Sequence, residues 1–292
     1  MEQSIRKMQN GASLEPLQRI SRRQFLYRNL VLAGTVALGE GVIAEGTPQV
    51  TRHTLEMRGL KKPMRLVQLS DFHRSWCVSE AFLMRVVEQA NELKPDVALL
   101  TGDFVTKSAG YMGSCLNALA RLDVKHGAYA VLGNHDYASD GHTAGPRVVR
   151  QLHSINIPVL TNAHIKLDTG LTIVGVDDYW LGHANPALAF QGVDMKGAVI
   201  GMTHNPGIFP WLSDRNCPFL AGHTHGGQIH FPLITPYLLQ SIGRKAGKYL
   251  SGWYREEGQP GSLYVSRGIG VVGIPMRFRC DPEITLFELE PA

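Results

Sequence analysis

Short apolar runs alternate along the chain with stretches in which apolar residues recur at helical spacing. Residues 79–93 place Phe82, Val86 and Ala90 on one side, which predicts a helix that Pro95 closes. Two further helices are predicted over 113–122 and near 143–153. Between these helices, apolar runs of strand length predict strands at 65–70, 97–101, 128–132, 158–160, 171–176 and 198–203. This order of strand, helix and strand indicates an α/β fold.

The pattern changes after residue 217, where the predicted segments are mostly strands joined by loops. Strands are expected at 218–221, 248–254, 262–266 and 283–289. A first part of alternating strands and helices, followed by a part made mostly of strands, favours two sheets packed together within one domain. No linker, repeat or low-complexity tract divides this part of the sequence, so a single domain is predicted over residues 47–292.

Residues 1–46 form a basic segment followed by a short apolar one, the order that secretion signals have. Ser21-Arg22-Arg23-Gln24-Phe25-Leu26 precedes the apolar run 30–44 and resembles the twin-arginine export signal. Two alternatives are a basic arm before an amphipathic helix and an uncleaved membrane anchor. The run is shorter than the roughly 20 residues of a spanning helix, and Glu40 interrupts it. We therefore expect export by the twin-arginine translocase, to the periplasm or the outer face of the cytoplasmic membrane.

The formal net charge of +4 belongs to the front of the chain. Residues 1–28 hold six basic and two acidic residues, so the remainder is neutral overall. A basic face that would bind nucleic acid is therefore not expected. The four cysteines show no C-x-x-C spacing, which argues against a zinc ribbon or a thioredoxin-type site.

Polar residues follow the apolar runs at the points where the predicted strands end. Asp71, Asp103 and Asn134 each come just after such a run. Ligand sites of open α/β sheets form outside the carboxyl ends of the strands, so these three oxygen donors should meet at one edge. His73 lies two residues after Asp71, and a locally extended chain would point both side chains the same way.

The second half of the chain supplies nitrogen donors in a similar position. His204 follows the predicted strand 198–203, and His223 and His225 follow 218–221 within a glycine-flanked segment. Glycine permits unusual dihedral angles and a close approach of the backbone. Carboxylates, imidazoles and an Asn amide, without a thiolate, suit Zn, Mn or Fe. Seven donors exceed the needs of one tetrahedral ion and suit two divalent ions about 3.5–4 Å apart that share a carboxylate.

The order of these short motifs resembles that of calcineurin-like metallophosphoesterases. The motifs are Asp71-Phe72-His73, Gly102-Asp103, Gly133-Asn134-His135-Asp136, His204 and Gly222-His223-Thr224-His225, and they span residues 65–226. The resemblance implies a four-layer α/β-sandwich in which two packed sheets are flanked by helices. It also implies the first metal on Asp71, His73, Asp103 and His225, and the second on Asp103, Asn134, His204 and His223. His135 would then face the substrate phosphate and leaving group, and Asp136 would orient His135.

The expected activity is hydrolysis of a phosphodiester by a metal-bound hydroxide. Two cations stabilise the attacking and the leaving oxygen, and a positioned His135 could protonate the leaving alkoxide. Three alternatives stay open: a phosphomonoesterase, a UDP-2,3-diacylglucosamine pyrophosphatase of lipid A synthesis, and a metal-binding scaffold without activity. The apolar stretch 231–250 could form a substrate lip that faces lipid, so a lipid-linked substrate and a membrane surface are further expected partners. A core strand with a solvated turn is the other interpretation of that stretch.

Overall fold

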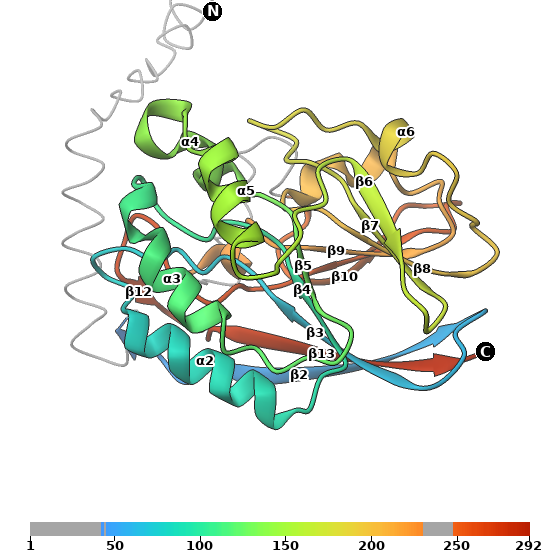
Figure 1. Ribbon diagram of the computed structural model, residues 1–292, viewed down its shortest axis with the longest axis horizontal. Coiled ribbons are helices and arrows are strands. Elements are labelled where there is room, and N and C mark those ends of the chain that lie inside the picture. The colour runs from blue at the N-terminus through green and yellow to red at the C-terminus, as the bar shows by residue number, and fades with distance from the viewer. Residues whose placement is uncertain (1–41, 44, 230–247) are drawn as a thin grey trace, which may run out of the picture. The chain divides into compact units, whose positions relative to one another are not determined.

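The computed structural model describes residues 42–43, 45–229 and 248–292, all of which belong to one compact unit (Figure 1). Most of the expected export segment and most of the stretch 231–250 lie outside these residues, so both interpretations stay predictions, as does the domain boundary after residue 46. None of the helices that the structure describes has the length and apolar character needed to cross a bilayer.

Five strands form the first sheet, with the C-terminal strand near its edge. Their order is β2 (Gln49–Met57), β13 (Glu283–Pro291), β3 (Met64–Leu69), β4 (Val97–Leu100) and β5 (Ala128–Ala130). Strands β3, β4 and β5 are parallel, whereas β13 runs antiparallel to β3 and parallel to β2. Figure 1 shows β13 and β2 side by side along most of their length.

Six strands form the second sheet. Their order is β10 (Gly252–Arg255), β11 (Ser262–Val265), β9 (Pro218–Ala221), β8 (Ala198–Met202), β7 (Leu171–Gly175) and β6 (Ala163–Lys166). The four inner strands are parallel, and the outer strands β10 and β6 are antiparallel to their neighbours. A short pair, β1 (Val42–Ile43) with β12 (Met276–Arg277), lies apart from both sheets.

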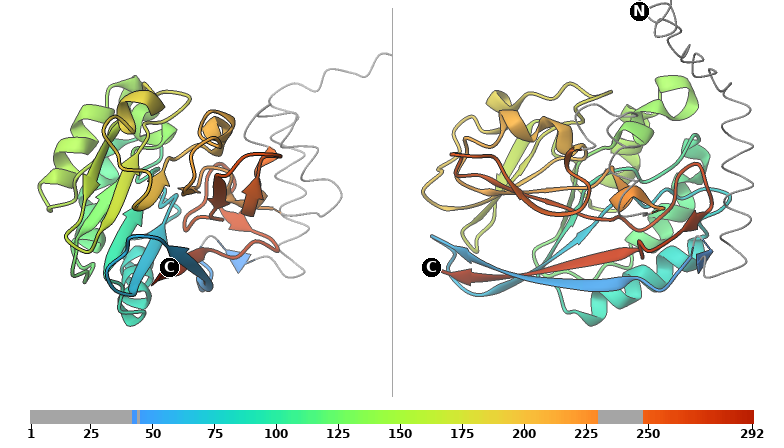
Figure 2. Two further views of the ribbon diagram at one scale, coloured as in Figure 1. Left: turned by 90° about the vertical axis from the view of Figure 1, so that its right-hand side faces the viewer. Right: turned by 180° about the vertical axis from the view of Figure 1, so that it is seen from behind.

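Helices cover the outer face of each sheet, as Figure 2 shows from two sides. The first sheet carries α2 (Glu80–Glu92), α3 (Met112–Leu119) and α5 (Gly145–His153), and the second carries the short elements α6 (Pro186–Ala189) and η2 (Pro206–Trp211). Further short helices are α4 (Asn134–His142), η1 (Ala109–Tyr111) and η3 (His225–Gly227). Ser79 caps the N-terminus of helix α2, because its hydroxyl accepts a hydrogen bond from the Phe82 amide.

Side chains of successive strand residues alternate between two separate cores. In β3, Leu66 packs between the two sheets, whereas Val67 and Leu69 pack beneath the helices of the first sheet. In β8, Ile200 joins the core between the sheets and Val199 the core on the outer side of the second sheet. Each fully buried aliphatic side chain contributes about 1.5–3 kcal/mol. These cores define four layers, which confirms the predicted two packed mixed sheets flanked by helices.

Most predicted elements are present, and the differences fall at sheet edges. The expected strand 158–160 is wrong, because that segment makes a single bridge from Val159 to Ala130 instead of a ladder. Strand β10 begins at Gly252, four residues after the expected start. The edge strands β2 and β6 were missed, because their partly exposed residues give no continuous apolar run.

Candidate metal centre

The carboxyl ends of the parallel strands in both sheets meet at one place, and the predicted ligands follow these ends directly. The first four come after β3, β4 and β5, and the other three come after β8 and β9. Two groups of donor atoms lie within 4.8 Å of one another inside each group: Asp71, His73 and His225, and Asp103, His204 and His223. The structure therefore brings together side chains separated by more than a hundred residues, as the strand-end argument predicts.

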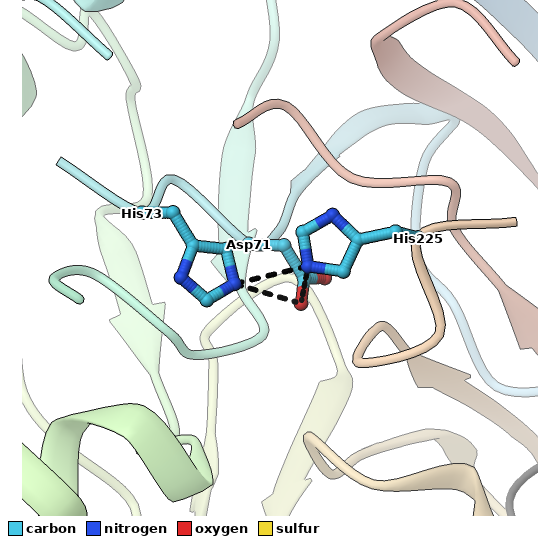
Figure 3. Close-up of side chains that lie close together, drawn as sticks. All are labelled: Asp71, His73 and His225. Carbon is cyan, nitrogen blue, oxygen red and sulfur yellow. Dashed lines mark hydrogen bonds and ion pairs between the residues drawn. The ribbon is translucent and has the colours of Figure 1, made fainter. Parts of the chain in front are cut away.

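The first group is a triad of buried side chains (Figure 3). The Nε2 atoms of His73 and His225 lie 3.0 Å apart. Asp71 Oδ1 lies 3.4 Å from Nε2 of His225 and 3.9 Å from Nε2 of His73. Figure 3 shows both rings turned toward this carboxylate oxygen. Two ring nitrogens and a carboxylate that converge in this way fit a cation, since imidazole and carboxylate are ligands of Zn, Mn and Fe.

The second group gathers around His204. Its Nε2 lies 3.2 Å from Asp103 Oδ2, 3.2 Å from Nδ1 of His223 and 3.2 Å from Oδ1 of Asn134. Asn134, the seventh predicted ligand, thus joins this group through its amide oxygen. Two imidazoles, one carboxylate and one amide oxygen form a second candidate site.

Asp103 connects the two groups. Its Oδ2 lies 3.3 Å from Nε2 of His73 in the first group and 3.2 Å from Nε2 of His204 in the second. Its other oxygen, Oδ1, accepts a hydrogen bond of 2.8 Å from the His135 amide. The carboxylate is thus fixed with one oxygen between the groups, which is the position that a ligand shared by two ions must occupy.

The backbone at the ligands is not extended, contrary to the expectation for Asp71 and His73. Asp71, His73, Asp103, His223 and His225 all have φ between +46° and +74°. Non-glycine residues rarely adopt this region, and such strain is concentrated at functional sites. The left-handed turns point the side chains at the same edge while the chain leaves the strands, which explains why residues two apart still converge.

Two glycines allow the ligand loops to approach each other closely. A Cβ atom on Gly222 would lie 2.2 Å from Asp71 Oδ2, and one on Gly133 would lie 2.2 Å from Asp103 Oδ1. The amide of His223 donates to both Asp71 oxygens at 3.0 Å, which joins the loops of the two sheets. The close approach expected for the glycine-flanked histidines is therefore present at Gly222.

Threonines fix the orientation of two ligand rings. Nδ1 of His204 lies 2.8 Å from the Thr101 carbonyl oxygen, which can only accept, so this nitrogen donates and Nε2 faces the other donors of the second group. Nδ1 of His73 lies 2.7 Å from the Thr106 hydroxyl. Such outer contacts set which nitrogen a metal binds. The sequence motifs do not include these threonines.

Burial keeps most of the ligand imidazoles neutral, and the neutral imidazole is the form that binds a metal. Burial lowers the pKa of His73 and of His225 well below the ordinary value, and it lowers the pKa of His223 to about 3. Neutral rings offer the lone pairs that cations bind. His204 differs, because Asp103 overcomes the effect of burial and raises the His204 pKa well above its usual range. A cation at this position would take the place of that proton.

The hydrogen bonds of Asp136 run to the backbone, and the role expected for it in orienting His135 stays a prediction. The Asp136 carboxylate accepts hydrogen bonds from four backbone amides: Asp103, Phe104, Val105 and Gly133. The His135 ring is half-buried and packs edge-on against the His73 ring, with centroids 4.9 Å apart. Asp136 therefore holds the loops after β4 and β5, while His135 lies beside the first group of donors.

Two arginines near the site, Arg74 directly after the first motif and Arg267, both contact protein groups. The Arg74 guanidinium donates to the Val78 carbonyl at 2.8 Å and lies over the Tyr111 ring. Arg267 pairs with the buried Glu283 at 3.1 Å.

Sequence reasoning missed a different arginine. The buried Arg277 lies 3.3 Å from Nδ1 of His225 and donates to backbone carbonyls, among them that of Gly270. No strand-end signal marks it.

A mixed α/β fold with two packed sheets and two carboxylate–histidine groups at the strand ends defines a metal-dependent hydrolase of the metallophosphoesterase type. Comparison with known proteins agrees. Residues 64–229 match the family model of calcineurin-like phosphoesterases, and the chain belongs to this family.

Relatives of similar length support the same family. The uncharacterized metallophosphoesterase YkoQ of Bacillus subtilis is 32% identical over 241 residues, which cover 78% of this chain and 84% of the relative. YkuE of the same organism is 29% identical, with 94% of this chain and 99% of the relative covered. A UDP-2,3-diacylglucosamine pyrophosphatase of Chlamydia muridarum is 26% identical over 76% of this chain and 82% of its own length.

Proposed function

We propose that this metallophosphoesterase hydrolyses phosphodiesters with two divalent cations, Mn, Zn or Fe, held at the two groups of donors. Asp71, His73, Asp103 and His225 would hold one cation, and Asp103, Asn134, His204 and His223 the other. The position of Asp103 Oδ2, 3.3 Å and 3.2 Å from one histidine of each group, carries the proposal. Bound there, two cations would lower the pKa of a water to supply the nucleophile and would stabilise charge on the transferred group.

The residues of the chain provide the remaining functions. His135 is half-buried beside His73 and can donate a proton to a leaving alkoxide, which general acids typically accelerate about 10²–10⁴-fold. Asp136 keeps Asp103 in place through the Asp103 amide. Asp71 is held by the hydroxyl of Ser70 at 2.6 Å. Fixed ligands of this kind reduce the reorganisation needed during reaction.

A diester is favoured over a monoester by the distribution of positive charge. A phosphodiester carries one negative charge at neutral pH, whereas a monoester approaches two. Arg74 donates to the Val78 carbonyl and Nε of Arg267 pairs with Glu283, so both side chains already contact protein groups. The two cations alone would suffice for the singly charged substrate.

Two other functions have less support. The name of the Chlamydia relative suggests cleavage of a lipid-linked nucleotide diphosphate, but the expected export would separate this chain from cytosolic nucleotide sugars. A lipid-linked substrate or a membrane surface remains a proposal that depends on the stretch 231–250. A metal-binding scaffold without activity would have no need of His135, yet its ring lies against His73 in the structure.

Export by the twin-arginine route is a proposal supported by Arg22, Arg23 and the apolar run that follows. Replacing both arginines by lysine in the full chain should keep the protein in the cytoplasm of a host with that translocase. Periplasmic recovery of the variant at the wild-type level would contradict this route.

Turnover of chromogenic esters tests the activity. Purified protein supplied with Mn²⁺ or Zn²⁺ should hydrolyse bis-p-nitrophenyl phosphate faster than p-nitrophenyl phosphate, and a chelator should abolish both reactions. Faster cleavage of the monoester would overturn the diester preference. Cleavage of UDP-2,3-diacylglucosamine, in preference to both chromogenic esters, would support the lipid nucleotide alternative.

A further inference from the structure

An exposed tryptophan lies against one of the candidate metal ligands. Trp180 is 48% exposed, although its ring packs perpendicular to the ring of His223, with centroids 4.4 Å apart. Its neighbour Leu181 is 40% exposed. Apolar side chains that stay in water at the edge of a polar site are available to a ligand. This position places an indole at the rim of the second group of donors.

The loop that carries Trp180 is fixed by two buried carboxylates that follow β7. Asp178 Oδ2 accepts hydrogen bonds from the amides of Trp180 and Leu181 at 2.9 Å and 2.7 Å. Asp177 accepts from the His183 amide at 2.8 Å and from the Tyr137 hydroxyl at 2.7 Å. The backbone that carries Trp180 is therefore held in place before any ligand arrives, and its ring packs on His223. A site formed in advance lowers the entropic cost of binding.

Trp180 and His135 contact different groups of donors. The His135 ring packs against His73 of the first group, and the Trp180 ring packs against His223 of the second. If His135 serves the leaving group, the ester substituent that stays on phosphorus extends toward the second group. Trp180 then lies where this retained substituent can reach it.

We propose that Trp180 is a specificity-determining residue that stacks on a planar ring in the retained ester group of a phosphodiester. The inference rests on the proposed function and names its substrate class: diesters whose retained substituent carries an aromatic ring or base close to the phosphate. A rigid, half-exposed indole suits this role, because aromatic stacking recognises any planar ring without hydrogen bonds.

Two esters that share a leaving group test the inference. Phenyl p-nitrophenyl phosphate and methyl p-nitrophenyl phosphate both release p-nitrophenol, and they differ in the retained substituent. Trp180→Ala should raise KM about 10-fold for the phenyl ester and leave KM for the methyl ester within about 2-fold. kcat for both esters should change little. Trp180→Phe should restore most of the phenyl preference, because it keeps a planar ring.

Binding of the products gives a readout that does not depend on turnover. Calorimetry should show that the wild type binds phenyl phosphate more tightly than methyl phosphate, and that Trp180→Ala loses the difference. Trp253→Ala is the matched control, because Trp253 is 38% exposed and packs on His53, Tyr264 and Phe287, none of them a candidate ligand. Trp253→Ala should keep the wild-type preference for the phenyl ester in KM and for phenyl phosphate in binding.

The outcomes separate the inference from the proposed function. An active wild type whose phenyl preference survives Trp180→Ala would overturn the inference and leave the phosphodiesterase proposal intact. The same conclusion follows if Trp180→Ala raises KM equally for both esters. A wild type with bound metal that cleaves neither ester would overturn the proposed function and the inference with it.

Discussion

The backbone amide of Asp103 donates a hydrogen bond to Oδ2 of Asp136, with 2.9 Å between nitrogen and oxygen. The same oxygen accepts from the Gly133 amide, also at 2.9 Å. One buried carboxylate therefore joins the end of β4, which carries Asp103, to the end of β5, which carries Asn134. The two ligands of the second group that follow the first sheet depend on this connection for their relative position.

Asp136→Asn should weaken metal binding without removing a ligand. The amide replaces one accepting oxygen by an NH₂ group, so buried amides lose their acceptor at a cost of about 1–3 kcal/mol. Loss of a residue that orients ligands typically costs about 10–100-fold in metal affinity. Titration with Mn²⁺ and thermal unfolding measure both effects.

Asp140→Asn is the control for this substitution, because Asp140 lies on the same helix with an exposed side chain. Surface substitutions usually change stability by less than about 0.5 kcal/mol. If Asp136→Asn kept its metal affinity and lost only rate, Asp136 would act on His135 after all, and the positioning role would be wrong.

His135→Ala should keep both metals and lose rate. A general acid contributes about 10²–10⁴-fold, and its contribution falls when the leaving group needs no proton. We therefore expect a larger loss for a diester with an alkyl leaving group than for one that releases p-nitrophenol. Steady-state rates and metal content of the purified variant check this. His142→Ala, on the same helix and exposed, should behave as wild type, and equal losses for both leaving groups would exclude the acid role.

Glu283→Gln should reduce stability at neutral pH and flatten the acid limb of the stability profile. Burial raises the pKa of Glu283, but hydrogen bonds from Arg267, Thr51 and Tyr264 outweigh this effect and hold the pKa below its ordinary value. The stabilisation is present above the unfolded pKa and is lost as pH falls toward the folded value. Urea unfolding between pH 7 and pH 3 should show a difference of about 1–3 kcal/mol at pH 7 that shrinks toward acid. A constant difference across this range would contradict the assignment.

The sequence predicts the central strands and the ligands for the same reason. β4 is buried along its whole length and reads as an unbroken apolar run, β3 is buried except at Arg65, and their ends mark where Asp103 and Asp71 must lie. Asp177 and Asp178 follow β7 in the same way, and this signal could have located the Trp180 loop.

Other features depend on contacts that no local pattern encodes. The left-handed backbone at Asp71 and His73 is imposed by packing between loops, because the amide of His73 donates to the Asp103 carbonyl at 2.9 Å. The role of Asp136 follows from amides more than thirty residues away in sequence. Edge strands such as β2, half-exposed and paired on one side, lack the apolar run that marks inner strands.

Anomalous diffraction from crystals grown with Mn²⁺ tests the shared carboxylate most directly. We predict two metal peaks about 3.5–4 Å apart, with an oxygen of Asp103 bound to both. His73 and His225 should bind one ion, and His204 and His223 the other. A single peak, or two peaks of which Asp103 binds just one, would contradict the account.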